Sequence, residues 1–130
     1  MIFMPFFGLA LISNSVKEGI LKAFKNEAAT KYEKVFVKLH TGDPGSEGKN
    51  NAAGEATRKE VAFTGTTTLK NSGALKWTGV STKETIKYVS FWTAASEGTF
   101  LANTITEAEK ALEAGDNLEI AAEGLSWTVA

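Results

Sequence analysis

The sequence predicts a mainly β protein, a β-sandwich of jelly-roll-like type with one N-terminal α-helix. Three observations support this fold class. After residue 34, short stretches alternate apolar and polar residues, a period typical of half-buried strands. Residues that favour turns, chiefly Gly, Asn, Asp and Pro, separate these stretches. Before residue 30, apolar residues recur at helical spacing instead.

Composition limits the functions open to the chain. Its 130 residues suffice for one domain with a sizeable core. With 14 basic and 15 acidic residues, the net charge of -1 provides no electrostatic footprint for nucleic acid or an anionic membrane. The chain has no Cys and a single His, which leaves little material for thiolate or acid–base chemistry. We therefore expect no enzymatic activity, no cofactor, no metal, and neither nucleic acid nor a membrane as partner.

Residues 1–12, MIFMPFFGLALI, form an almost wholly apolar arm ahead of a single domain over residues 13–130. The arm is shorter than the roughly 20 residues that span a bilayer, and it lacks the basic start of a signal peptide. Because an exposed patch this apolar would promote aggregation, we expect it to pack on its own core or on a neighbouring subunit, and we favour the neighbour. The arm residues expected at that interface are Phe3, Phe6, Phe7, Leu9 and Leu11.

The helix is predicted over residues 15–28. Ser15 and Glu18 fit a capping box, in which the hydroxyl and the carboxylate three residues later satisfy backbone N–H groups. One face of this helix is apolar, made by Val16, Ile20, Ala23 and Phe24. We expect that face to lie against the sheet.

The chain is organised around the stretch at residues 34–45, KVFVKLHTGDPG. Its first half alternates, with Val35, Val37 and Leu39 on one face, and predicts a strand in the middle of a sheet. Its second half is a turn, in which we expect Asp43 to accept backbone N–H bonds rather than to bind a metal. Asp43 and Pro44 complete the set of residues expected at an interface.

The rest of the chain is predicted as strands and turns. A polar excursion over 46–57 is either a contact surface or a mobile loop. The stretch at 86–93 is apolar on both faces, which indicates a central strand. Residues 104–113 have a helical or irregular pattern. The remaining strands are expected at 58–63, 74–77, 99–102, 118–121 and 125–129.

Three sets of residues are candidates for chemical sites. His40 is the only imidazole, and we expect it to make a structural hydrogen bond at the start of the loop rather than to serve a nucleophile. The carboxylates of Glu107, Glu109 and Glu113 are expected on a solvated face rather than as a glycosidase pair. The three tryptophans lie in alternating strands, where burial in a core or interface is commoner than sugar stacking: Trp77, Trp92 and Trp127.

Several motifs, in order, resemble a widespread group of small phage virion proteins labelled tail fibre or minor tail proteins. The most specific are VKLHTGDPG at 37–45 and YVSFWTAASEGTFLA at 88–102. The others are NSVKEGIL (14–21), ATRKEVAFT (56–64), NSGALKW (71–77) and EAGDNLEIAAEGLSWTV (113–129).

The resemblance implies a non-enzymatic structural subunit located in the phage particle. It also implies a homo-oligomer, for which we expect a trimer, with contacts to other virion proteins. A tail fibre or tail tip is the favoured location, and decoration of the capsid surface is the alternative. A carbohydrate-binding module for the host wall is a further alternative, which requires exposed aromatic residues. The weakest hypothesis is a small hydrolase centred on His40.

Overall fold

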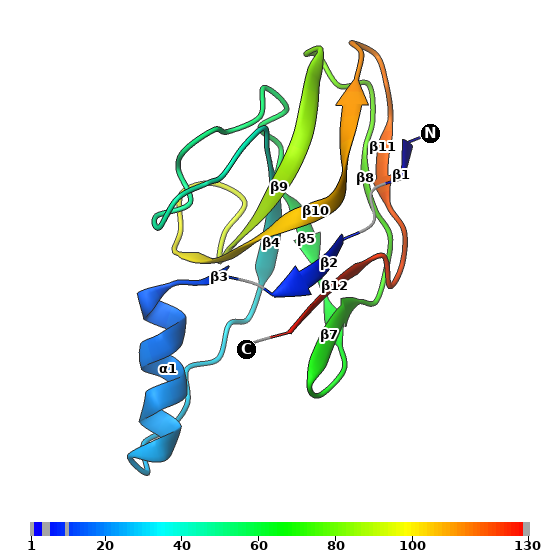
Figure 1. Ribbon diagram of the computed structural model, residues 1–130. Helices are drawn as coiled ribbons and strands as arrows, with labels where there is room; N and C mark the ends of the chain where they lie inside the picture. The colour runs from blue at the N-terminus through cyan, green and yellow to red at the C-terminus, as the bar shows by residue number, and fades with distance from the viewer. Residues whose placement is uncertain (1, 4–5, 10, 129–130) are drawn as a thin grey trace.

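A computed structural model describes residues 2–3, 6–9 and 11–128, and over these residues the protein is mainly β with one helix (Figure 1). This confirms the predicted fold class. Within the same residues no helix is long and apolar enough to cross a membrane. The largest sheet has five strands in the order β3 (Leu11–Ile12), β10 (Phe100–Leu112), β9 (Glu84–Trp92), β4 (Val35–His40) and β5 (Lys59–Val61).

Two smaller sheets follow the same chain segments one after the other. One has the order β1 (Ile2–Phe3), β11 (Leu118–Ile120) and β8 (Leu75–Trp77). The other has the order β2 (Phe6–Leu9), β12 (Leu125–Thr128), β7 (Thr68–Asn71) and β6 (Phe63–Thr64). Each strand of the first small sheet is followed or preceded in the chain by the corresponding strand of the second: β1 by β2, β11 by β12 and β8 by β7. The strands therefore have the same order in both sheets, and the two sheets together form one interrupted layer.

A single hydrophobic cluster joins this layer to the five-stranded sheet. It contains Val37 and Phe91 from the large sheet together with Trp77, Leu118 and Leu125 from the two smaller ones, all at most 1% exposed. Contact between apolar faces of two sheet layers is the arrangement of a sandwich. The jelly-roll connectivity stays a prediction.

The strands β4 and β9 occupy the positions predicted for them. Strand β4 pairs with β9 on one side and β5 on the other, and β9 lies between β4 and β10. On β9 the buried residues include Val89 and Phe91 on the core face and Ser90 and Trp92 on the outer face. The prediction of a central strand covered on both faces is therefore confirmed.

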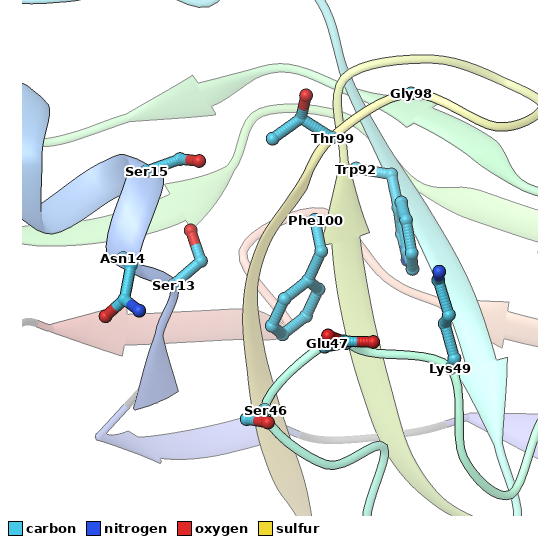
Figure 2. Close-up of a pocket in the computed structure, with 10 residues that line it drawn as sticks. All are labelled: Ser13, Asn14, Ser15, Ser46, Glu47, Lys49, Trp92, Gly98, Thr99 and Phe100. Atoms are coloured by element: carbon cyan, nitrogen blue, oxygen red, sulfur yellow. The ribbon is translucent and has the colours of Figure 1, made fainter.

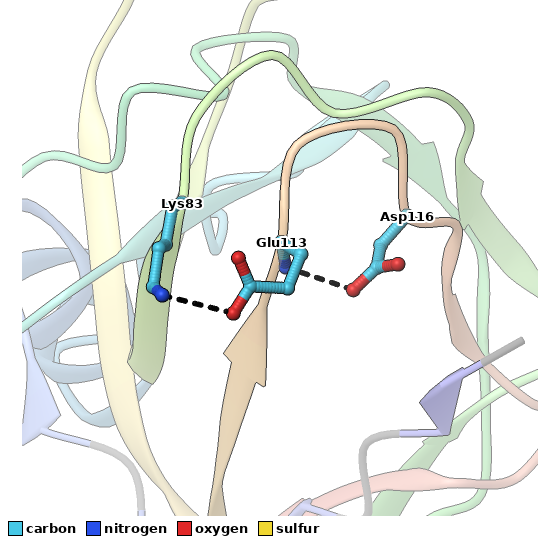
Figure 3. A network of polar contacts seen from close by, with 3 residues as sticks. All are labelled: Lys83, Glu113 and Asp116. Atoms are coloured by element: carbon cyan, nitrogen blue, oxygen red, sulfur yellow. Dashed lines mark hydrogen bonds and ion pairs between the residues drawn. The ribbon is translucent and has the colours of Figure 1, made fainter.

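The helical or irregular pattern predicted at residues 104–113 is wrong, because β10 continues through this stretch to Leu112. The β9–β10 register shifts between Ile105 and Lys110, a β-bulge that obscures the alternation of buried and exposed residues. The strand ends in a turn where Glu113 N–H donates to Asp116 Oδ2 at 2.8 Å and Lys83 Nζ lies 3.1 Å from Glu113 Oε1 (Figure 3).

Helix α1 (Asn14–Phe24) begins and packs differently from the prediction. Its N-cap is Ser13, whose Oγ accepts a hydrogen bond from Val16 N–H at 3.3 Å, so the proposed Ser15–Glu18 box is not the cap. Val16, at the start of the predicted apolar face, packs against the core, but the rest of the helix projects away from the sheets instead of lying along them (Figure 1). Gly19 is its buried residue, close to Thr30. Apolar spacing identifies a helix face, but it does not identify what covers that face.

The described parts of the arm pair with strands of the same chain. Strand β1 pairs in parallel with β11, β2 pairs in parallel with β12, and β3 pairs antiparallel with β10. The arm is therefore continuous with the domain at the backbone level. Residues 1, 4, 5 and 10, and the arm's side chains as far as Leu11, lie outside the description. The expected intersubunit contacts of Phe3, Phe6, Phe7, Leu9 and Leu11 stay a prediction.

Asn71 sits where the interrupted layer changes from one small sheet to the other, and it is fully buried. Its Nδ2 donates to the carbonyls of Gly73 and Ala121 at 2.7 and 2.9 Å, and its Oδ1 accepts from Leu125 N–H at 2.8 Å. One side chain thus replaces the strand pairing that is lost at the break. The sequence suggested only a turn residue here.

We expect Asn71→Ala to lower the free energy of unfolding by about 2 to 3 kcal/mol, because it leaves the buried Leu125 N–H without its partner and removes two further bonds to the partly buried carbonyls of Gly73 and Ala121. Asn117→Ala is the matched control, since the exposed Asn117 accepts one bond, from Gly79 N–H. The control is expected to cost about 1 kcal/mol or less. Urea unfolding of the two variants measures both effects, and equal losses would contradict the role assigned to Asn71.

Candidate functional site

A buried chain of hydrogen bonds lies on the outer face of the five-stranded sheet. Ser90 Oγ is 2.7 Å from both His40 Nε2 and Trp92 Nε1, and His40 Nδ1 is 2.9 Å from the carbonyl oxygen of Asn50. His40 and Ser90 are completely buried, and Trp92 is almost so. The chain therefore connects strand β4, strand β9 and the loop that follows β4.

The donors and acceptors in this chain fix the proton on the imidazole. The carbonyl of Asn50 only accepts, so His40 Nδ1 carries hydrogen and Nε2 is an acceptor. Ser90 then donates its hydroxyl hydrogen to Nε2 and accepts from Trp92 Nε1–H. Every polar atom of the chain has a partner when His40 is neutral, which confirms the predicted structural hydrogen bond at the start of the loop.

The electrostatic surroundings also favour neutral His40. Burial lowers its pKa below the ordinary value of 6.5, and the hydrogen bonds from the ring to the loop backbone oppose this only in part. The positive charges of Lys38 and Arg58 lower the pKa further. A buried imidazole whose two nitrogens are both occupied has no contact with a substrate, so the hydrolase hypothesis finds no support in its geometry.

Arg58 covers the face of Trp92 that points away from the core. Its guanidinium carbon is 4.3 Å from the centroid of the indole, a cation–π contact. Arg58 Nη1 also donates to the carbonyls of Ala94 and Glu97, at 2.9 and 2.7 Å. Glu97 and Gly98 both have positive φ, 55° and 74°. These backbone angles form a tight turn after β9, in which the carbonyls of Ala94 and Glu97 both accept hydrogen bonds from the guanidinium.

The loop predicted as an exposed excursion folds back over the same face. At Gly48 the backbone has φ of +72° and lies so close to the Phe100 ring that a Cβ there would overlap it. Asp43 Oδ1 accepts from Gly45 N–H at 2.8 Å, which confirms the predicted turn. Asp43 is exposed and Pro44 is buried within the chain, so Asp43 is the better placed of the two for a contact; the interface role of both stays a prediction.

The folded-back loop and the turn after β9 border an open cavity of about 390 Å³ beside the N-terminal end of helix α1 (Figure 2). Trp92 and Phe100 form its apolar wall, with their ring centroids 5.6 Å apart. Polar side chains make the rest of the lining: Ser13, Asn14, Ser15, Ser46, Glu47, Lys49 and Thr99. Within the described residues no group of three or more His, Asp or Glu is arranged to hold a metal ion.

The other sequence candidates are not brought together. Glu109 and Glu113 are exposed and pair with Lys87 and Lys83 respectively, which matches the predicted solvated face, while the side chain of Glu107 lies outside the description. Trp77 is buried in the core, and Trp127 is half-buried against Phe63 and Phe91. Neither Trp77 nor Trp92 offers an open platform for a sugar ring.

The second candidate surface is the exposed apolar side of α1, formed by Ile20, Leu21 and Phe24 and called here the α1 apolar face. These side chains are 42%, 57% and 84% exposed. With about 100° of rotation per residue, Ile20 and Phe24 lie on one side of the helix and Lys22 on the opposite side. A large aromatic side chain this exposed, beside two aliphatic ones, is a feature of contact surfaces.

The fold is a mainly β scaffold whose single imidazole is buried and fully hydrogen-bonded. The particular family follows from comparison with known families: the chain belongs to the family described as Podophage GP4 fiber I protein gp80, whose model matches residues 11–128. The protein is therefore a component of a phage particle, as the sequence resemblance implied. No curated protein matches the chain.

The matched residues begin at the last strand of the arm. Residues 1–10, which include β1 and β2, precede the match, whereas α1, the Trp92 region and all later strands lie inside it. The α1 apolar face and the cavity beside Trp92 are thus parts of the family domain.

We expect the His40 imidazole to titrate below pH 6.5 in the folded protein. Between its folded pKa and 6.5 the unfolded chain binds a proton that the folded chain does not, so stability falls as the pH falls through this window, by up to about 1.4 kcal/mol per pH unit. The chain has one His, so its ring resonances in an NMR titration are unambiguous. A folded-state pKa of 6.5 or higher would contradict the assigned hydrogen bonds.

Proposed function

We propose that the protein is a structural subunit of a podophage tail fibre that works by self-association, as a homotrimer, and by contact with other virion proteins. The observation that carries this proposal is the 84% exposure of Phe24 on a helix that projects from the domain. The family membership supplies the fibre context. The trimer rests on the likeness to phage fibre proteins.

The α1 apolar face suits a contact between identical copies. Full burial of a Leu, Ile or Phe side chain is worth about 1.5–3 kcal/mol, so covering the three exposed side chains in each copy contributes several kcal/mol. Symmetric oligomers place the same patch of each subunit around one axis, and three projecting helices meet this requirement without moving the sheets. Lys22, on the opposite side of the helix, remains in solvent in this arrangement.

The proposed place of the subunit is the tail fibre or tail tip, and the capsid surface is the alternative. The two places differ in symmetry and position, so labelling the protein with antibody in intact particles and viewing them by electron microscopy separates them. The family description, which names a fibre protein, favours the tail.

We expect the Ile20→Ser/Phe24→Ser double variant to shift the purified protein from oligomer to monomer, or to weaken association at least tenfold. Light scattering coupled to size exclusion measures the mass. Lys22→Ser is the control, because it changes the opposite side of the same helix and is expected to leave the oligomer intact. Circular dichroism verifies that both variants keep the native fold.

A wild-type protein that is monomeric at all concentrations would contradict the proposal, as would an unchanged oligomer in the double variant. Deleting residues 1–12 is a less informative test, because it removes β1, β2 and β3 from the three sheets and so alters folding together with association.

A further inference from the structure

A second cavity, of about 320 Å³, adjoins the first at Trp92 and has three cationic side chains in its lining. It is lined by Lys38, Gly48, Lys49, Arg58, Trp92, Glu97 and Gly98. It shares Lys49, Trp92 and Gly98 with the 390 Å³ cavity of Figure 2, so the two are neighbouring parts of one surface, called here the Trp92 cleft.

The three cations of the cleft come from separate parts of the chain. Lys38 is on β4, Lys49 is in the folded-back loop and Arg58 immediately precedes β5. Across the described residues, none of the three is within ion-pair distance of a carboxylate, whereas five other lysines are. Glu97 lines the cleft, but it is the Glu97 carbonyl that accepts a hydrogen bond from Arg58, not the carboxylate.

This arrangement holds like charges together at an energetic cost. Burial lowers the pKa of Lys38, and the positive charge of Arg58 lowers it further; burial also lowers the pKa of Arg58. The Glu97 carboxylate lines the cleft but is within ion-pair distance of neither cation, so an anion that binds between Lys38 and Arg58 stabilises the charged form of both. The stacking on Trp92 and the two carbonyl contacts hold Arg58 in place, while its Nε and Nη2 remain available as donors.

The adjoining cavity has a different chemistry. Its wall carries hydroxyl groups from Ser13, Ser15, Ser46 and Thr99, the amide of Asn14 and the carboxylate of Glu47. All of these groups are able to bond to hydroxyl groups of a ligand, and the Glu47 carboxylate disfavours an anion in this half. The volume of each cavity is near the lower limit of roughly 300 Å³ for small-molecule sites. The combined volume is therefore larger than the volume that a bare inorganic anion fills. An anionic group beside a polyol matches the two halves.

We propose that the Trp92 cleft binds a saccharide unit that carries a phosphate or a carboxylate, with the anion between Lys38, Lys49 and Arg58 and the sugar hydroxyls toward the Ser13–Ser15 side. Trp92 and Phe100 serve as the rigid wall, because Trp92 is covered by Arg58 and is not an open stacking surface. Such a site adds recognition of an anionic glycan to the structural role, and it does not depend on self-association.

The test is an NMR titration of the full chain at low salt with four probes: glucose 1-phosphate, glucuronate, glucose and inorganic phosphate. We expect shifts at Lys49, Trp92 and the 94–99 turn with glucose 1-phosphate or glucuronate. Binding of glucose and of inorganic phosphate is expected to be at least fivefold weaker. The stronger of the two charged sugars identifies the anion, phosphate or carboxylate.

Lys49→Gln is the cleanest variant, because Lys49 is exposed and takes part in none of the ion pairs found among the described residues. We expect it to weaken binding of the charged sugar about fivefold, as removal of one partly solvated charge contact does. Lys38→Gln, on the strand, tests the second cation, and its fold is verified by its amide spectrum.

Lys70→Gln, an exposed lysine on β7 in another sheet, is the matched control and is expected to bind like the wild type. Equal affinity of the Lys49→Gln and Lys70→Gln variants would overturn the proposal. So would inorganic phosphate that binds as tightly as glucose 1-phosphate, or shifts confined to a different surface. Because all these readouts use the soluble protein, they are independent of the oligomer mass measured for the α1 variants.

Discussion

The hydroxyl of Ser90 is the constraint on which the outer face of the five-stranded sheet depends. It lies in a fully buried position between an imidazole and an indole, at 2.7 Å from each. Unpaired polar groups at such a depth cost about 1–3 kcal/mol each, so His40, Ser90 and Trp92 hold one another in a single arrangement. That arrangement fixes the Trp92 ring, on which Arg58 and the turn after β9 are assembled, and it fixes the loop after β4 through the carbonyl of Asn50.

The same principle operates at the other side of the molecule. Where the interrupted layer changes sheet, Asn71 supplies a donor and an acceptor to backbone groups that strand pairing no longer satisfies. Both sites use a buried polar side chain to hold irregular backbone. The difference is in what the irregular backbone does: at Asn71 it lets one layer bend over the core, while beside Trp92 it shapes a charged cleft.

The sequence predicted the features that depend on local pattern. Alternation identified β4, a stretch that is apolar on both faces identified the central β9, and turn chemistry identified the Asx-turn at Asp43. It could not show that residues 104–112 are a strand, because the register shift after Ile105 breaks the period. Nor could spacing show that α1 stands away from the sheets, since a helix that packs on its own domain and one that packs on a partner have the same apolar stripe.

The candidate sites were harder to predict, because they are assembled over long separations in the chain. Ser90 and Asn71 are ordinary residues in the sequence, and only tertiary pairing shows that each is buried with all its partners. Lys38, Lys49 and Arg58 form no motif, and β4, its loop and the start of β5 bring them together. One signal was present in β4. Lys38 and His40 lie on the outer face of this central strand, which indicates that something more polar than a second sheet covers that face.

The separation between core and contact surface explains why this scaffold suits an assembly. The three side chains of the α1 apolar face are exposed and lie outside the hydrophobic cluster, so they add little to the stability of a single subunit. Their apolar area is therefore available for association at almost no cost to folding. The Trp92 cleft is likewise outside the hydrophobic core, on a face held rigid by hydrogen bonds rather than by apolar packing. The two proposed surfaces, one for association and one for ligand binding, can therefore change independently, because neither the α1 apolar face nor the three cations of the cleft belong to the hydrophobic cluster.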